Sequence, residues 1–188
     1  MKYFKKLVGD RIYLSPRNIE DVEQFTQWMN DFEITDYTGR TATLMSLSGE
    51  KDYLEKDSNP EANFVIVDLE NDTMVGTVSL EKIDRTNSRA ELGIFIGNIE
   101  YRGKGYGVEA INLLLDFGFN YMNLNSIELI VLECNERAKA CYKKCGFKEM
   151  GRQRKAKFIN GKYYDTLVMD ILREEFEGRE YIKNKNVR

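Results

Sequence analysis

The chain has 188 residues, of which 42% are hydrophobic, and this fits a single domain over residues 1–188, with a core of about 10–176 and a charged tail of 177–188. Its net charge of −3 and pI near 5.3 argue against a nucleic-acid partner, because nucleic-acid binders need a basic face. The absence of histidine excludes Ser-His-Asp and Cys-His nucleophile designs, so any proton acceptor has to be a carboxylate, water or the backbone.

The first half of the sequence predicts a strand over residues 11–16, a helix over 20–30 and a second helix within 47–56. A hairpin follows, with strands at 63–68 and 74–83 around Asn71 and Asp72, and then a strand over 89–96. From about residue 108, apolar side chains recur on one face of a long predicted helix.

The second half predicts a strand over 127–133, a short helix opening near Asn135 and a last strand over 166–172. Residues 173–188 are charged and predict a frayed helix or a disordered tail. The predicted fold class is therefore α/β (α+β), with a mixed, mostly antiparallel central sheet flanked by helices.

Neither an apolar run of membrane length nor a secretory leader is recognised, so we expect a cytoplasmic protein without a membrane partner. Three cysteines without a secretory signal argue against a disulfide framework. Cys141 and Cys145 could share a metal, but without histidine or a C-x-x-C motif they are better interpreted as free thiols in packing positions. No metal site is expected.

A glycine-rich segment, Arg102-Gly103-Lys104-Gly105-Tyr106-Gly107, connects the predicted strand at 89–96 to the long helix. Glycines at alternate positions let backbone N–H groups converge, and the helix N-terminus adds unsatisfied donors. A phosphate or pyrophosphate is the expected guest. The spacing lacks what a G-x-x-x-x-G-K-[ST] loop or a G-x-G-x-x-G motif requires, which disfavours a nucleotide triphosphatase and a dinucleotide dehydrogenase.

Two motifs carry a family resemblance. The glycine-rich segment reads R-x-x-G-x-G, and the segment from Asn135 to Phe147 reads N-x-x-A-x-x-x-Y-x-x-x-G-F. In this order they resemble the GNAT superfamily of N-acetyltransferases, which use acetyl-coenzyme A (acetyl-CoA) and release coenzyme A. The run at 158–165 is similar to the final hairpin of the branch that contains ribosomal-protein and spermidine acetyltransferases.

The resemblance implies where the cofactor binds. The glycine-rich segment would hold its pyrophosphate, and its pantetheine arm would lie where two central strands splay apart, pairing with the backbone of the first of them. The residues expected to bind acetyl-CoA are Phe95, Ile96, Gly97, Arg102, Gly103, Lys104, Gly105, Tyr106, Gly107, Asn135, Ala138 and Tyr142.

Two catalytic residues are expected. The resemblance implies that Tyr142 is the acid that protonates the leaving thiolate, and the alternative is that Tyr142 only packs in the core. For Asn135, the alternative to cofactor binding is a role as the N-cap of the helix, and both roles can coexist. Alternation along the strand at 89–96 places Glu91 on the face of Gly93 and Phe95, which makes it the best base. An ion pair, for example with Arg89, or a base acting through water are open alternatives, and Glu81 and Glu133 are weaker base candidates.

The acceptor is expected to be a primary amine, either a protein N-terminus or a small polyamine, which attacks the thioester of acetyl-CoA directly. Residues 20–36 contain six acids and no base, which suits a cationic acceptor, whereas 137–157 contain nine bases and one acid, which suits the cofactor's phosphates. Alternatives are a non-catalytic CoA-binding sensor, a phosphate-binding regulatory module, or acetylation of an amino sugar or another small amine. A homodimer is compatible with the sequence.

Overall fold

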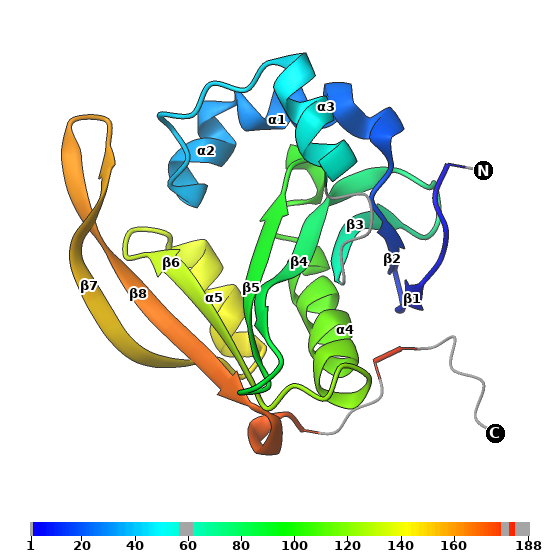
Figure 1. Cartoon of the computed structure of the whole chain (residues 1–188), viewed down its shortest axis with the longest axis vertical. Helices are drawn as coiled ribbons and strands as arrows, with labels where there is room; N and C mark the ends of the chain where they lie inside the picture. Colours follow the sequence, from blue (N-terminus) through cyan, green and yellow to red (C-terminus); the bar gives the residue numbers. More distant parts are fainter. Residues whose placement is uncertain (1, 57–61, 178–180, 183–188) are drawn as a thin grey trace.

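A mixed eight-stranded sheet forms the centre of the computed structural model, which describes residues 2–56, 62–177 and 181–182 (Figure 1). In spatial order the strands are β1 (Leu7–Val8), β2 (Ile12–Pro16), β3 (Asn63–Asp68), β4 (Met74–Asp84), β5 (Arg89–Ile96), β6 (Ser126–Leu132), β8 (Lys162–Leu172) and β7 (Lys148–Ile159). The helices are α1 (Val22–Met29), α2 (Phe32–Thr38), α3 (Leu47–Lys56), α4 (Tyr106–Asn120) and α5 (Glu136–Lys144). The predicted fold class is confirmed.

The strands β5 and β6 form the one parallel pair in the described sheet, and they separate soon after they meet. Their ladder contains three residue pairs and ends at Glu91 opposite Glu128. Beyond that point β5 remains paired with β4 through Ile96, and β6 remains paired with β8 through Leu132. The sheet therefore opens into a V between β5 and β6.

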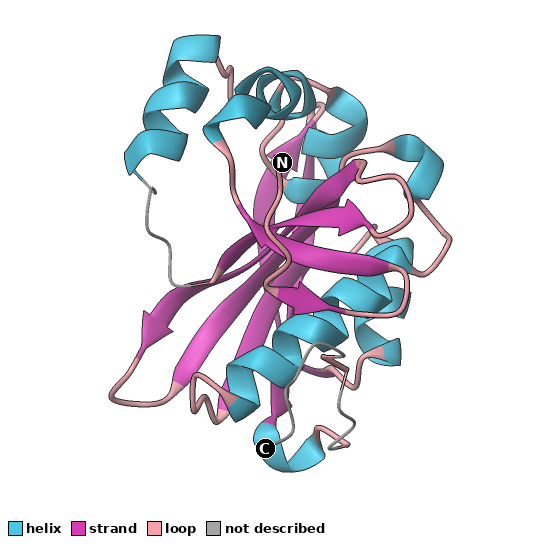
Figure 2. Ribbon diagram, turned by 90° about the vertical axis from the view of Figure 1, so that its right-hand side faces the viewer, coloured by secondary structure: helices cyan, strands magenta, loops and turns pink. Residues whose placement is uncertain are grey.

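Helices cover both faces of the sheet (Figure 2). One apolar cluster joins the strands to α4 and α5, with Phe119 and Tyr142 among its buried members. The second cluster contains Phe25 and Trp28 of α1 and Leu54 of α3. Along β5, Leu92 belongs to the first cluster and Phe95 packs against the second, as the predicted alternation requires.

Several elements were not predicted from the sequence: β1, α2 and β7. The helix α2 has Asp31 as its N-cap, whose side chain accepts a hydrogen bond from the N–H of Glu33, and it ends at Gly39, which has a φ of 69°. The strand β7 is an almost fully exposed edge strand, so it has no apolar alternation to detect. Other elements differ by a few residues; α4, for example, begins at Tyr106.

Part of the C-terminal tail packs on the molecule instead of fraying. Ile182 is buried in the first apolar cluster, and the backbone N–H groups of Tyr181 and Ile182 donate to Oδ2 of the buried Asp116, at 2.9 and 3.1 Å. The predicted frayed or disordered tail is wrong for these two residues. Residues 178–180 and 183–188 of the tail lie outside the described residues.

Candidate active site

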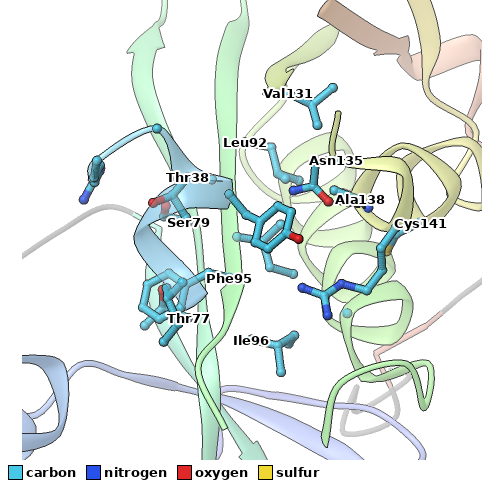
Figure 3. A pocket seen from close by; sticks show the side chains of 18 of the residues that line it. Thr38, Thr77, Ser79, Leu92, Phe95, Ile96, Val131, Asn135, Ala138 and Cys141 are labelled. Carbon is cyan, nitrogen blue, oxygen red and sulfur yellow. Dashed lines mark hydrogen bonds between the residues drawn. The ribbon is translucent and has the colours of Figure 1, made fainter. Parts of the chain in front are cut away.

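A cavity of about 510 Å³ occupies the opening of the V (Figure 3). Its walls come from both faces of the sheet: from α5 and the glycine-rich turn on one side, and from α1, α2 and α3 on the other. Figure 3 shows Thr77 and Ser79 on one side of the view and Asn135, Ala138 and Cys141 on the other. The strand β5 contributes lining residues from Glu91 to Ile96.

The glycine-rich turn places an open helix N-terminus at this cavity. Gly103 and Gly105 have φ angles of 73° and 88°, a backbone region that favours glycine. Gly105 is the N-cap of α4 and brings no side chain to cap its first turn. The first N–H groups of α4 therefore have no side-chain acceptor, as an anion-binding turn requires. Gly107 lies inside the first turn of α4 without a positive φ.

The outer side of this turn is held by an ion pair that the sequence does not reveal. Arg11 Nη1 donates to the carbonyl oxygen of Lys104 at 2.9 Å, and Arg11 Nε lies 3.0 Å from Glu109 Oε2. Glu109 Oε1 also accepts from the backbone N–H groups of Asp10 and Arg11, both at 2.8 Å. The carboxylate in the first turn of α4 is thereby neutralised on the side away from the cavity.

Arg102 faces the end of β5. Its Nε donates to the carbonyl of Ile96 at 3.0 Å, its Nη2 donates to that of Gly97 at 3.2 Å, and Nη1 lies 3.8 Å from Glu33. It lines the cavity, and its Nε and Nη2 groups also fix the path of the chain from β5 into the turn. Arg102, which the sequence predicts to bind the cofactor, therefore also has a structural task.

The end of β5 divides into lining and packing residues. Phe95 and Ile96 line the cavity, whereas Gly97 and Lys104 are not among the lining residues. Gly97 is buried, and a Cβ there would lie 2.3 Å from the Trp28 ring, so this close approach requires glycine. The remaining residues predicted to bind the cofactor all line the cavity: Arg102, Gly103, Gly105, Tyr106, Gly107, Asn135, Ala138 and Tyr142.

Tyr142 lines the cavity from α5 and is 8% exposed. Within residues 2–56, 62–177 and 181–182 its hydroxyl makes no hydrogen bond, although its ring packs edge-on against Phe147. Burial is the main cause that raises the pKa of this phenol, and the neighbouring thiols of Cys141 and Cys145 raise it further. Tyr142 is thus a protonated donor with a free hydroxyl at the cavity.

Asn135 has the N-cap role, because its Oδ1 accepts from the N–H of Ala138 at 3.1 Å, and it also lines the cavity. Cys145, the C-cap of α5, is in a packing position, because it is buried and its Sγ donates to the carbonyl of Val108 at 3.8 Å, whereas Cys141 of α5 is half-buried and lines the cavity. Among the described residues, no three potential ligands gather into a metal site.

The carboxylates predicted as bases occupy different settings. Glu91 lines the cavity and forms an ion pair with Lys82 at 2.7 Å; Arg89, the partner suggested by the sequence, pairs with Asp84 at 3.5 Å instead. Glu81 lines the cavity and accepts from Ser79 Oγ at 2.9 Å. Glu133 lies outside the lining and is bound by Arg152 and by the N–H of Asp165, both at 3.0 Å.

One carboxylate of the cavity was not predicted at all. Glu50 of α3 lines the cavity and is 3% exposed, and no described residue donates a hydrogen bond to it. Burial raises its pKa, and the nearby Arg17 and Arg40 lower it by a smaller amount. Its signal in the sequence was hidden, because a charged residue in a polar helix usually faces solvent.

Residues 11–148 match the family described as the acetyltransferase (GNAT) domain. The chain belongs to this family. It is similar to the uncharacterized N-acetyltransferase p20 of Bacillus licheniformis, with 30% identity over 92% of this chain and 98% of that protein. It is also 31% identical to the putative ribosomal N-acetyltransferase YdaF of Bacillus subtilis, over 57% of this chain and 58% of that protein.

Among solved structures, the chain resembles spermidine N-acetyltransferase from Vibrio cholerae in complex with CoA and spermine. The TM-score is 0.82 at 30% identity, and the match covers 88% of this chain and 98% of that one. The chain is therefore an acetyl-CoA-dependent N-acetyltransferase, and the expectations of the family, the enzyme class and the cofactor are confirmed. In the part of the chain that is described, no helix is long and apolar enough to cross a membrane.

Proposed function

We propose that this enzyme acetylates a primary amine by direct attack on the thioester, with Tyr142 as the general acid. The observation that carries the proposal is the side chain of Tyr142, which lines the cavity and whose hydroxyl has no hydrogen-bond partner among the described residues. The hydroxyl is not among the buried atoms that lack a partner, so it opens on the cavity, where it can donate to a ligand. Because its pKa is raised, the phenol stays protonated and can donate to the departing thiolate.

The cavity supports the other requirements of the reaction. The turn at Gly103–Gly107 and the N-terminus of α4 would bind the pyrophosphate, and the edge of β5 beyond Glu91 is free of β6 and would receive the pantetheine arm. When bound, acetyl-CoA supplies the acyl group as a thioester. Its placement beside Tyr142 would convert the transfer into an effectively unimolecular step.

The base in this proposal is Glu91, acting directly or through water. Glu91 lines the cavity, and its carboxylate lies 2.7 Å from Lys82 Nζ. This ion pair favours the alternative in which Glu91 is structural and the amine loses its proton to water. Glu81 shares the cavity but is already engaged by Ser79.

The acceptor is a small polyamine or a protein N-terminus. The polyamine fits the named activity of the spermidine N-acetyltransferase relatives, and the protein N-terminus fits the ribosomal N-acetyltransferase relative. Both present a primary amine that a cavity with carboxylates on its strand wall would bind.

The experiment is an acceptor screen with purified protein and acetyl-CoA, reading thiol release with polyamines, peptides, amino sugars and amino acids. Tyr142→Phe keeps the ring and removes the donor, so kcat should fall by about 10²–10⁴-fold while coenzyme A affinity is retained. Near-full kcat in this variant, with acetyl transfer shown to be rate-limiting, would refute the acid role. Coenzyme A binding without acetylation of any amine would favour a non-catalytic sensor instead.

A further inference from the structure

The charges around the cavity do not match a purely cationic acceptor. Its lining contains six basic and four acidic side chains: Arg17, Arg40, Arg102, Arg137, Lys144 and Lys157, against Glu33, Glu50, Glu81 and Glu91. A site dedicated to a multiply charged polyamine would be expected to carry an excess of carboxylates. Arg102 belongs to the glycine-rich turn, and Arg137 and Lys144 belong to α5, where the phosphates of the cofactor are expected. The other three cations, Arg17, Arg40 and Lys157, lie outside these two segments.

Arg40 and Lys157 supply positive charge at the other end of the cavity. Arg40 follows α2, and Lys157 lies near the tip of the β7–β8 hairpin. The two segments touch at Gly39, where a Cβ would lie 3.3 Å from Cδ and Cε of Lys157 and 3.6 Å from its Nζ. Neither cation has an acidic partner within 4 Å among the described residues. The contact of Lys157 with Gly39, the neighbour of Arg40 in the sequence, brings two cations to one end of the cavity, where Glu50 is the carboxylate on which Arg40 acts. An anionic group of a ligand would be attracted to this end.

This end of the cavity is separated from the glycine-rich turn by the sheet. The turn leads into α4, which covers one face, whereas α1, α2 and α3 cover the other face. Arg40 belongs to the second group, as its electrostatic effect on Glu50 of α3 also indicates. Arg40 therefore lies on the side of α3, away from the pyrophosphate turn, and Lys157 reaches this end from the hairpin through its contact at Gly39. A second substrate can enter from this side.

Glu50 marks the same end as a binding surface. The Glu50 side chain is 3% exposed and lines the cavity, and no described residue donates a hydrogen bond to it. Its oxygens are not among the buried atoms that lack a partner in the described structure, so they open on the cavity, where a ligand N–H can donate to them. This end of the cavity thus offers one acceptor for an N–H group and two cations for an anionic group.

We propose that the preferred acceptor is an amine that also carries an anionic group, which Arg40 and Lys157 bind. The proposal rests on the proposed acetyl transfer and chooses among its acceptors. A peptide N-terminus followed by an acidic side chain has the required chemistry, with a backbone N–H for Glu50. Free spermidine lacks the anionic group and is a poor acceptor by this reasoning.

The test measures acetylation of three hexapeptides that begin with Ser and differ only at the second residue, which is Glu, Gln or Lys. Spermidine and the free amino acids glutamate and glutamine are measured as further acceptors. With saturating acetyl-CoA, kcat/KM for the Glu peptide should exceed that for the Gln peptide by roughly tenfold, which corresponds to about 1.4 kcal/mol. The Lys peptide and spermidine should be used less well than the Gln peptide. The glutamate pair separates recognition of a free amino acid from recognition of a peptide.

Variants identify the residues responsible. The exposed side chains of Arg40 and Lys157 can be replaced without disturbing the core, so Arg40→Gln with Lys157→Gln should remove the preference for the Glu peptide. The KM for acetyl-CoA and the use of the Gln peptide should change less than twofold. Arg154→Gln on the same hairpin, outside the cavity lining, is the matched control and should keep the preference.

Three results would overturn the inference. One is equal or better use of the Lys peptide or spermidine by the unmodified enzyme. Another is an unchanged Glu preference in the double variant, and the third is a rise in the KM for acetyl-CoA alone, which would assign both cations to the cofactor. If no amine is acetylated, the proposed function fails, but calorimetry on the coenzyme A complex still tests the subsite. Tighter binding of the Glu peptide than of the Gln peptide, abolished in the double variant, would support the subsite. Equal binding of the two peptides would refute it.

Discussion

Replacement of the two glycines on either side of Tyr106 should weaken acetyl-CoA binding for different physical reasons. Gly105 has a φ of 88°, and a Cβ there would lie 3.2 Å from Nη2 of Arg11, whose guanidinium holds the turn. Gly107 has no positive φ. A Cβ at Gly107 would meet Cys141 Sγ at 3.6 Å and Ile96 Cγ1 at 3.9 Å, both from residues that line the cavity. A side chain strains the backbone at Gly105 and fills the cofactor's space at Gly107.

The two effects have different magnitudes in stability. An L-residue in the left-handed region costs about 1–2 kcal/mol, and in a chain of this size 1 kcal/mol shifts Tm by roughly 2–4 °C. Gly105→Ala should therefore lower Tm by roughly 2–8 °C. The Cβ of Gly107→Val would meet only ordinary contacts, and valine is a slightly better helix former than glycine, by a few tenths of a kcal/mol. Its Tm should stay within about 2 °C of the unmodified protein.

In binding, Gly107→Val should be the more severe change. Forcing extra methyl groups into a space that a ligand needs costs about 1–3 kcal/mol, and tenfold corresponds to 1.4 kcal/mol, so the Kd for coenzyme A should rise roughly 5- to 150-fold. Calorimetric titration gives Kd and thermal denaturation gives Tm. Gly161→Ala is the control, since Gly161 has a φ of 77° in the β7–β8 turn and nothing nearby to clash with. A folded Gly107→Val protein with unchanged Kd would refute the assignment of this turn to the cofactor.

Three further predictions concern individual side chains. Arg11→Ala removes the hydrogen bond to the Lys104 carbonyl, and hydrogen bonds to charged groups contribute about 1.5–3 kcal/mol. The KM for acetyl-CoA should therefore rise about tenfold, with kcat within about twofold of the unmodified enzyme. Steady-state kinetics measure both, with Arg89→Ala as the control, and a fall in kcat in place of a rise in KM would contradict the prediction. Glu91→Gln should depress kcat/KM mainly at low pH, with partial recovery at high pH, where more amine is already neutral; a pH profile identical to that of the unmodified enzyme would return Glu91 to its ion pair with Lys82. Because the pKa of Tyr142 is raised, this residue keeps its proton as pH rises, so kcat should not decline between pH 7 and about pH 10 through loss of the acid, and a decline that Tyr142→Phe abolishes would count against the assignment.

Elements with strong local patterns were predictable from the sequence. The strand at Arg89–Ile96 alternates, the helix at Tyr106–Asn120 has an apolar stripe, and both are confirmed. The helix α2 has only seven residues and a polar sequence, so its N-cap Asp31 and the left-handed Gly39 define it better than any periodicity does. The strand β7 exists because it pairs with β8, which is a tertiary cause that local propensity does not contain.

The site was predictable where one segment carries several of its residues. The spacing from Asn135 to Tyr142 lies on one short helix, so the sequence predicts that both residues face the same space, and both line the cavity. Partners distant in sequence were not predictable: Arg11 reaches Glu109 across 98 positions. The pairing of Glu91 with Lys82 depends on an irregular register between β4 and β5. Such contacts follow from the assembled sheet and from no local pattern.

The opening between β5 and β6 also has a kinetic consequence. The cavity is lined from both faces of the sheet, so donor and acceptor can enter from opposite sides and occupy it together. In the proposed direct attack, no side chain stores the acetyl group between the binding of the two substrates. Lines in double-reciprocal plots with both substrates varied should therefore intersect, as for a ternary complex. A single molecule that joins coenzyme A to the acceptor amine through an acetyl bridge should pass through the opening between β5 and β6 and inhibit competitively against both substrates.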